Sequence, residues 1–372
     1  MQLWRGHREK FWIRSFLSID SEFPDPNDFG TNTELSAAVQ RMSGSRASGD
    51  DGITIGMIRM TLPVIGPELL HVVNASLSSG VLPTPWKVAD VIPLHKSGSK
   101  LEPNNYRPVS ILPTVVKIVE RIVCEQLMTY LIDHNILCNE QHGFRPGHST
   151  ESAMLHVIGH VVENLDSGLI SCITTADTSK AFDSVKHARL LDKLGWYGIC
   201  AHWFDNWLTE RSQRVRGGTT AAPVTHGVIQ GSLLGPILFL LFTNDMTAYF
   251  DDCKIVMYAD DTQFVHSGNP SDLPGLRQRV EASLKVASAW FADNSLRINP
   301  SKTDVMVVRC RQRRDIDFCI NFEDTVINPS QSVKVLGMSV DCNLMGFACV
   351  AGGASFLRDY QRSGQDVSPF AI

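Results

Sequence analysis

The chain has no apolar run long enough to cross a membrane and no signal peptide at its start. Its longest apolar stretch covers residues 237–242, whereas a membrane span needs roughly 20 residues. The first eight residues lead into charge rather than into an apolar segment. We therefore expect an intracellular protein that does not act at a membrane.

Paired cysteines are absent as well. Nine cysteines are scattered along the chain, none of them in a Cys-X-X-Cys pair, and the histidine spacings do not match a zinc site. An odd, unclustered set of cysteines indicates free thiols in a reducing compartment. The sequence also lacks internal repeats and low-complexity tracts.

An excess of positive charge is lacking too. The formal net charge is −5 and the isoelectric point is near 6.2, whereas nucleic-acid-binding domains are more often basic. Composition alone therefore does not indicate a nucleic-acid partner, although a local basic groove is compatible with an acidic total. The 372 residues, 43% hydrophobic and 20% charged, are typical of a globular protein of two or three domains.

Hydrophobic periodicity predicts a mixture of helices and strands without the regular alternation of a doubly wound sheet. An antiparallel sheet backed by helices, an α+β fold, fits this pattern best. The expected helices cover 34–46, 53–80, 113–132, a segment capped by Ser149, a segment through Phe242 and 275–292. The expected strands cover 88–92, 171–177, parts of 212–228, the hairpin 254–265 and 305–308.

The hairpin KIVMYADDTQFV, residues 254–265, has two adjacent carboxylates at its turn. Aspartate is a common turn residue, which is one explanation for Asp260 and Asp261. Like charges side by side repel each other, however. The second explanation is that a bound cation neutralises them.

A third carboxylate, Asp177, ends the predicted strand 171–177. If the two strands are neighbours in one sheet, Asp177 and Asp260 face one point. Successive side chains of a strand point to opposite faces, so Asp261 is expected to be auxiliary unless the turn is distorted. Such carboxylates suit Mg²⁺, and two ions about 3.5–4 Å apart can support phosphoryl transfer.

Eight sequence blocks follow one another in a fixed order. They are Trp86-Lys87 with VIPLHK (91–96), NYRPVS (105–110), GFR (143–145), DTSKAFD (177–183), GVIQGSLLGP (227–236), YADD (258–261), NPSKT (299–303) and VLG (335–337). In these blocks the chain resembles the reverse transcriptase of non-LTR (LINE-type) retrotransposons, of the jockey-like kind, over about residues 47–341.

The resemblance implies an α+β right-hand polymerase with fingers and a palm that contains an antiparallel sheet. It also implies RNA-directed DNA synthesis, in which dNTPs are added to a primer 3′-OH. The implied partners are an RNA template with a DNA primer, and the implied cofactor is a pair of Mg²⁺ ions, with Mn²⁺ as an alternative. Nucleus or cytoplasm is the implied location.

The resemblance also assigns roles to residues of the acidic cluster. Asp177, Asp260 and Asp261 match the metal-binding carboxylates of the family. Lys302 matches a lysine proposed to protonate the pyrophosphate leaving group. A solvated loop lysine is the other interpretation of Lys302.

A second group of matching residues concerns the incoming nucleotide. Arg107 matches a residue that binds the triphosphate, Phe182 matches the bulky side chain that excludes a ribose 2′-OH, and Gln230 and Gly231 match a loop that positions nucleotide and template. Simpler alternatives are a surface arginine, a core phenylalanine and the start of a helix. The arginines at 309, 311, 313 and 314 could contact phosphates or form a solvated face.

The resemblance divides the chain into three parts. Residues 1–46 are expected to be a leader, partly helical or disordered, 47–341 the fingers and palm, and 342–372 a short tail, so that the thumb is largely missing. Thr174 and Thr175 stand where the family usually has large apolar residues. A second interpretation is therefore a truncated, inactive remnant that at most binds nucleic acid or a partner. A third, an RNA-copying RNA polymerase, is disfavoured by Phe182.

Overall fold

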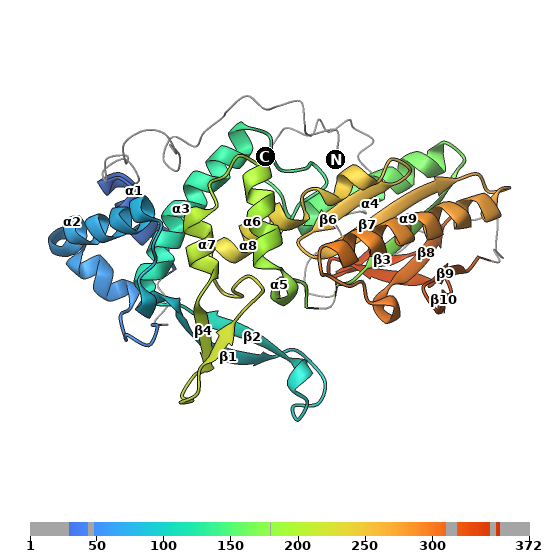
Figure 1. The fold of residues 1–372 in the computed structure, drawn as a ribbon. Helices are drawn as coiled ribbons and strands as arrows, with labels where there is room; N and C mark the ends of the chain where they lie inside the picture. The colour runs from blue at the N-terminus through green and yellow to red at the C-terminus, as the bar shows by residue number, and fades with distance from the viewer. Residues whose placement is uncertain (1–29, 44–47, 179, 310–317, 343–346, 350–372) are drawn as a thin grey trace. The chain divides into compact units, whose positions relative to one another are not determined.

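The structure, a computed structural model, describes residues 30–43, 48–178, 180–309, 318–342 and 347–349. The chain divides into two compact units. Unit 1 consists of Met1–Cys138, Lys180–Asp245 and Asn294–Leu296, and unit 2 consists of Asn139–Ser179, Met246–Asp293 and Arg297–Ile372. Both units mix helices with sheets (Figure 1). Within the described ranges, no helix combines the length and the apolar character that a membrane span requires.

Unit 1 is rich in helices whose ends follow from local sequence signals. Thr31 begins the first helix by accepting a hydrogen bond from the backbone of Glu34, whose side chain bonds back to Thr31, a capping box. The second helix ends at Gly80, where φ is 69°, a conformation that glycine adopts easily. The helices are α1 (Asn32–Arg41), α2 (Ile55–Ser79), α3 (Thr114–Asp133), α5 (Ala181–Ser184), α6 (His187–Trp196), α7 (His202–Leu208) and α8 (Leu234–Thr243), with short 3₁₀ turns at Thr84–Lys87 and Pro103–Asn105.

The sheet of unit 1 has four strands in the order β2-β1-β4-β5. Its strands are β1 (Val88–His95), β2 (Tyr106–Ile111), β4 (Arg211–Val215) and β5 (Ala222–Val224). Strand β1 pairs antiparallel with β2 but parallel with β4. The predicted strand at 88–92 is therefore confirmed, but this sheet is mixed rather than purely antiparallel.

A buried carboxylate joins three segments of unit 1. Glu120 of α3 is fully buried, and its two carboxylate oxygens accept hydrogen bonds from Trp207 Nε1 at 3.1 Å and from the backbone N–H of Leu233 at 2.8 Å. Burial raises the pKa of Glu120 to about 7, against the opposing effects of these hydrogen bonds and of the buried guanidinium of Arg211.

This raised pKa predicts a pH dependence of stability. Because the folded state binds the proton of Glu120 more tightly than the unfolded state, the stability it contributes is fully present below pH 4.5 and is lost as the pH rises through about 7. We expect wild type to lose about 3 kcal/mol over this window relative to Glu120→Gln. Urea unfolding at pH 4.5 and pH 7.5 measures this difference, and Glu68→Gln, an exposed substitution on α2, should not change the slope.

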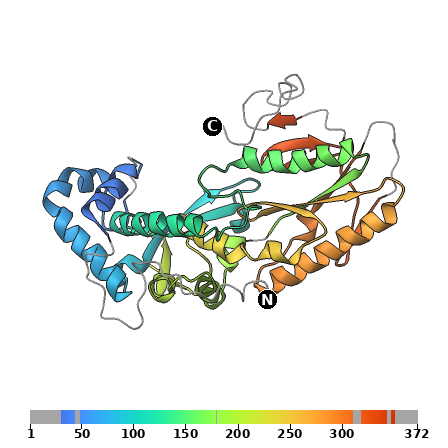
Figure 2. The same cartoon turned by 90° about the horizontal axis from the view of Figure 1, so that it is seen from above.

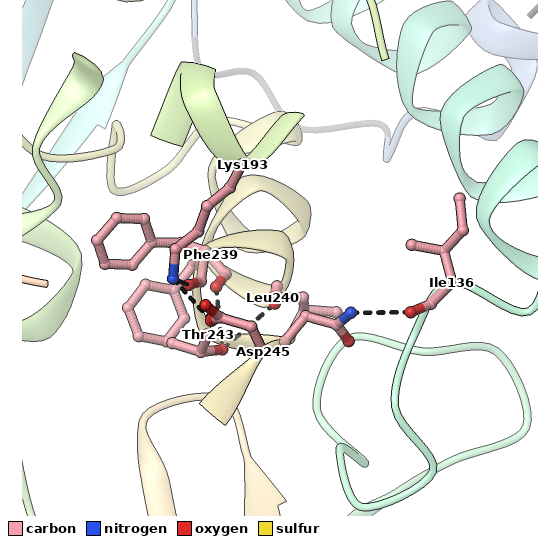
Figure 3. A network of polar contacts seen from close by, with 8 residues as sticks. Ile136, Lys193, Phe239, Leu240, Thr243 and Asp245 are labelled. Carbon is pink, nitrogen blue, oxygen red and sulfur yellow. Dashed lines mark hydrogen bonds and ion pairs between the residues drawn. The ribbon is translucent and has the colours of Figure 1, made fainter. Parts of the chain in front are cut away.

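A buried lysine fixes the C-terminal end of α8 (Figure 3). Lys193 of α6 is completely buried, and its Nζ donates to the backbone oxygen of Phe242 at 2.6 Å and to Asp245 Oδ1 at 2.7 Å. The ammonium also lies 4.8 Å from the centre of the Phe242 ring. Burial lowers the pKa of Lys193 to about 8, although Asp245 opposes the change. A cation at a helix C-terminus satisfies free carbonyl groups there.

Unit 2 is built on a four-stranded sheet in the order β6-β7-β3-β8, in which every pairing is antiparallel. Its strands are β3 (Ile170–Ala176), β6 (Lys254–Tyr258), β7 (Asp261–Gly268) and β8 (Asp304–Val308). The predicted hairpin and the predicted strands at 171–177 and 305–308 are confirmed. So is the predicted antiparallel sheet backed by helices, for this unit.

Two helices cover the opposite faces of this sheet (Figure 2). Helix α4 (Thr150–Asp166) begins at Ser149, whose hydroxyl accepts from the backbone of Ser152 as predicted, and it packs on Ile173 and Val265. Helix α9 (Leu273–Asp293) covers the other face, where Ser283 bonds to His266. Because successive side chains of a strand point to opposite faces of the sheet, neighbouring residues of one strand face different helices.

Short strands complete unit 2, and the sequence patterns did not predict them. They are β9 (Ile320–Phe322), β10 (Thr325–Ile327), β11 (Ser332–Val335), β12 (Met338–Asp341) and β13 (Phe347–Cys349), with 3₁₀ turns at Met246–Tyr249 and Pro300–Lys302. Valines of β11 and β12 pack against α4 in the core. Most of the predicted tail, 342–372, lies outside the described residues, and so do residues 1–29 and 44–46 of the predicted leader, whose described part contains α1.

One of the two threonines that stand where the family usually has large apolar residues lies in the middle of β3. Thr174 is fully buried between Phe264 and Val305 of the neighbouring strands. Its hydroxyl lies near the Cys172 thiol on the same strand face, but among the described residues it makes no full hydrogen bond. A thiol is a weak hydrogen-bond partner, so the burial of this hydroxyl is only partly compensated.

Candidate active site

The turn between β6 and β7 positions two carboxylates. Tyr258 pairs with Asp261, so Ala259 and Asp260 form a two-residue hairpin loop. Ala259 has φ of 56°, as the first position of such loops often requires, at a cost of about 1 kcal/mol for a residue other than glycine. Asp260 is therefore the second residue of the loop, and Asp261 is the first residue of β7.

Strand β3 delivers the third carboxylate beside this turn. Ala176 pairs with Thr262, so continuing the antiparallel register brings Asp177 opposite Asp261. The next residue, Thr178, donates from its hydroxyl to the backbone oxygen of Asp260 at 3.3 Å. The end of β3 and the hairpin turn are therefore adjacent in unit 2.

The electrostatics of the turn agree with this proximity. Partial desolvation by the surrounding protein raises the pKa of Asp261 to about 6, and the negative charges of Asp260 and Asp177 add to the rise. The Asp261 side chain still reaches solvent, so a cation can approach it. Three carboxylates thus share one region of negative potential.

Lys302 lies against this acidic cluster. Its Nζ is 2.8 Å from Asp177 Oδ2, in an ion pair whose side chains are 61% and 33% exposed. The backbone holds the lysine there, because Asn299 donates its N–H to the backbone oxygen of Asp177 at 3.0 Å and Ile298 pairs with Thr178. The NPSKT and DTSKAFD blocks are therefore joined directly.

The donor set decides which cation these residues could hold. Among the described residues, no group of three His, Cys, Asp or Glu side chains is already arranged as a metal site. The acidic cluster nevertheless offers only carboxylate oxygens, which are the ligands that Mg²⁺ prefers. The residues therefore fit Mg²⁺ in their chemistry, with one oxygen of Asp177 engaged by Lys302.

The residues predicted to bind a nucleotide lie in unit 1, and two of them are neighbours. Gln230 Nε2 donates to Asp183 Oδ1 at 2.6 Å, and the N–H of Val228 donates to the backbone oxygen of Phe182 at 2.8 Å. The Phe182 ring, which is half-buried, stacks on Phe239 of α8 with 4.4 Å between ring centres. The helix behind them, α8, is almost entirely buried.

The loop of Gln230 and Gly231 packs directly on β2. The backbone N–H of Ser110 donates to the backbone oxygen of Gln230 at 2.7 Å. At Gly231 φ is 105°, and a Cβ there would lie 2.4 Å from the backbone oxygen of Ser110. Only glycine fits there. The same strand carries Arg107, which is exposed and pairs with Leu94 of β1.

The basic run and a glutamine near the GFR block have different places in the structure. Most of the basic run at 309–314 falls outside the described residues. Gln141, which the sequence analysis overlooked, is buried and hydrogen-bonded to Ala259 of the hairpin turn. The sequence offered one signal for Gln141: it stands two residues before Gly143, the first residue of the GFR block.

Comparison with known proteins identifies the family. Residues 94–340, more than half of the chain, match the family described as reverse transcriptase (RNA-dependent DNA polymerase). The chain therefore belongs to the reverse transcriptases, and within them to the non-LTR retrotransposon type that its eight blocks resemble.

Several curated relatives support this assignment. The chain is 28% identical over 327 residues to a probable RNA-directed DNA polymerase from transposon BS of Drosophila melanogaster, covering 84% of this chain and 36% of that protein. It is 27% identical over 348 residues to the RNA-directed DNA polymerase from the mobile element jockey of the same species, covering 89% and 37%. The chain thus spans little more than a third of the length of these relatives.

Proposed function

We propose that this chain catalyses RNA-directed DNA synthesis, adding dNTPs to the 3′-OH of a DNA primer on an RNA template. The observation that carries the proposal is the placement of Asp177, Asp260 and Asp261 at adjacent ends of β3 and the β6–β7 hairpin. In this proposal the antiparallel sheet of unit 2 is the palm, and β1 and β2 belong to the fingers.

Asp177 and Asp260 would hold two Mg²⁺ ions, with Mn²⁺ as an alternative, and Asp261 would assist them. When bound, such ions stabilise the attacking and leaving oxygens of a phosphoryl transfer. When no cation is bound, the Lys302 ammonium neutralises Asp177, with 2.8 Å between Nζ and Oδ2. The same ammonium, which is largely exposed, would serve as the acid that protonates the pyrophosphate leaving group.

Arg107, Gln230 and Gly231 would bind the incoming nucleotide. The exposed guanidinium of Arg107 can bind phosphate oxygens with two parallel hydrogen bonds. Asp183 fixes the amide of Gln230 by accepting from its Nε2 at 2.6 Å. The glycine at 231 allows this loop to lie against the backbone of Ser110. Because Ser110 and Arg107 are both on β2, the Gln230 loop and Arg107 are attached to the same strand of unit 1.

Phe182 would exclude ribonucleotides by occupying the space of a 2′-OH, supported from behind by Phe239. We expect Phe182→Ala to increase the use of rNTPs relative to dNTPs by about 10- to 100-fold, because relief of a steric clash is worth about 1–3 kcal/mol. Single-nucleotide incorporation with dTTP and UTP measures this ratio. Phe182→Tyr, which keeps the ring, should retain the wild-type ratio, and an unchanged ratio in Phe182→Ala would assign the ring to core packing.

The proposed activity is tested with purified protein on an oligo(dT)-primed poly(A) RNA template. Labelled dTTP should be incorporated with Mg²⁺ present and not after chelation by EDTA. Circular dichroism establishes that the protein is folded. Folded wild-type protein that binds primer–template without extending it would contradict the proposal and would support the inactive remnant.

A further inference from the structure

One buried glutamine, Gln141, joins the hairpin turn to the backbone of Gly143 through its side-chain amide. Gln141 is 1% exposed. Its Oε1 accepts from the backbone N–H of Ala259 at 2.9 Å and from that of Gly143 at 2.8 Å. Its Nε2 donates to the backbone oxygen of Ala259 at 3.2 Å. Both backbone polar groups of Ala259 are therefore bound by one side chain.

The backbone around Gln141 is itself attached to β6. Met257 donates its N–H to the Glu140 oxygen and accepts from the His142 N–H, each at 2.8 Å, so that Gln141 forms a parallel bridge with Met257. A Cβ at Gly143 would lie 2.4 Å from the Ala259 nitrogen. This close approach explains why the GFR block begins with glycine.

These contacts act on the residue that determines the shape of the turn. Ala259 is buried, and its φ of 56° is unfavourable for alanine. Hydrogen bonds from a rigidly held amide offset that cost and satisfy two polar groups that water cannot reach. Asp260 follows directly, so the backbone at Ala259 sets the direction in which the Asp260 carboxylate leaves the turn.

We propose that Gln141 is a positioning residue that holds the YADD turn in the conformation in which Asp260 and Asp261 can bind divalent cations. The proposal rests on the proposed function for its catalytic consequence. The effect of the Gln141 amide on the YADD turn, and through the turn on cation affinity, can be measured without any catalytic turnover.

The test compares wild type with Gln141→Ala in three measurements. Titration with Mn²⁺, followed by electron paramagnetic resonance, gives the cation affinity, which we expect to weaken by about 10-fold or more, as is common when the residues that orient metal ligands are removed. Hydrogen exchange should accelerate in the peptide that contains residues 258–262. In primer extension, the Mg²⁺ concentration for half-maximal rate should rise by a similar factor.

A second substitution separates turn geometry from general stability. Because glycine adopts positive φ without the penalty of alanine, Ala259→Gly in the Gln141→Ala background should restore part of the Mn²⁺ affinity. Asn164→Ala is the matched control, since this amide of unit 2 bonds to Ser171 Oγ, at the start of β3, at 2.9 Å. It should lower the melting temperature modestly and leave Mn²⁺ affinity unchanged.

Each outcome decides the proposal. A Gln141→Ala protein that melts earlier but binds Mn²⁺ like wild type would overturn it and leave Gln141 a structural residue only. If Gln141→Ala does not fold, hydrogen exchange of the wild-type protein tests the proposal instead. The backbone N–H of Ala259, which donates to Gln141 Oε1, should then exchange slowly, and fast exchange would overturn the proposal. If wild type binds Mn²⁺ but extends no primer, the proposed function fails, whereas weaker Mn²⁺ binding by the variant still supports this role of Gln141.

Discussion

Asp260→Asn is expected to reduce nucleotide incorporation by at least about 1,000-fold, because a bound cation contributes several kcal/mol of charge stabilisation to phosphoryl transfer. Asparagine keeps the size of the side chain but removes its charge. The variant should fold at least as well as wild type, since one of the charges that raise the pKa of Asp261 is removed. Single-turnover primer extension with Mg²⁺ measures the loss.

A matched control distinguishes this loss from a general effect of charge. Asp251, an exposed acid in the loop before β6, belongs to the same unit and lies outside the proposed acidic cluster. Asp251→Asn should retain incorporation within about twofold, because surface charges away from a site have small effects. Incorporation by Asp260→Asn at more than a tenth of the wild-type rate would remove Asp260 from the metal site.

Lys193→Met is expected to lower the free energy of unfolding by about 3 kcal/mol, because it leaves Asp245 without its buried partner and a helix-end carbonyl without a donor. Methionine fills a similar volume, so cavity formation contributes little. Urea unfolding at pH 7 measures the change. Lys186→Met, at an exposed position before α6, should change stability by less than about 0.5 kcal/mol.

A double-mutant cycle shows whether the ion pair causes the loss. With Asp245→Asn added, the orphaned charge is gone, so the double variant should be more stable than Lys193→Met alone. Equal or lower stability of the double variant would mean that the aliphatic chain of Lys193, and not its charge, stabilises this end of α8.

The sequence predicted the central elements of unit 2 because each has a local signal. Short runs of β-branched and large apolar residues on both sides of YADD predicted the hairpin, and Ser149 marked the start of α4. The sequence predicted that Asp177 and Asp260 face one point because Asp177 was expected at the end of a strand and Asp260 at the tip of the hairpin. The family blocks placed Lys302 near the site, but only the structure brings its Nζ to Asp177.

The features that escaped prediction depend on contacts between distant segments. The parallel pairing of β1 with β4 joins Val88 to Ser212, and no local pattern distinguishes it from an antiparallel one. Strands β9 to β13 are three or four residues long, too short for periodicity to appear. Gln141 reads as an ordinary polar residue, because its role comes from the turn that it contacts.

Diffraction from crystals soaked in Mn²⁺ tests the account most directly, because anomalous scattering locates the ion without reference to activity. The account predicts anomalous density in coordination contact with the carboxylates of Asp177 and Asp260. Saturating Mn²⁺ with no density at these two residues, or density bound only by other side chains, would contradict it.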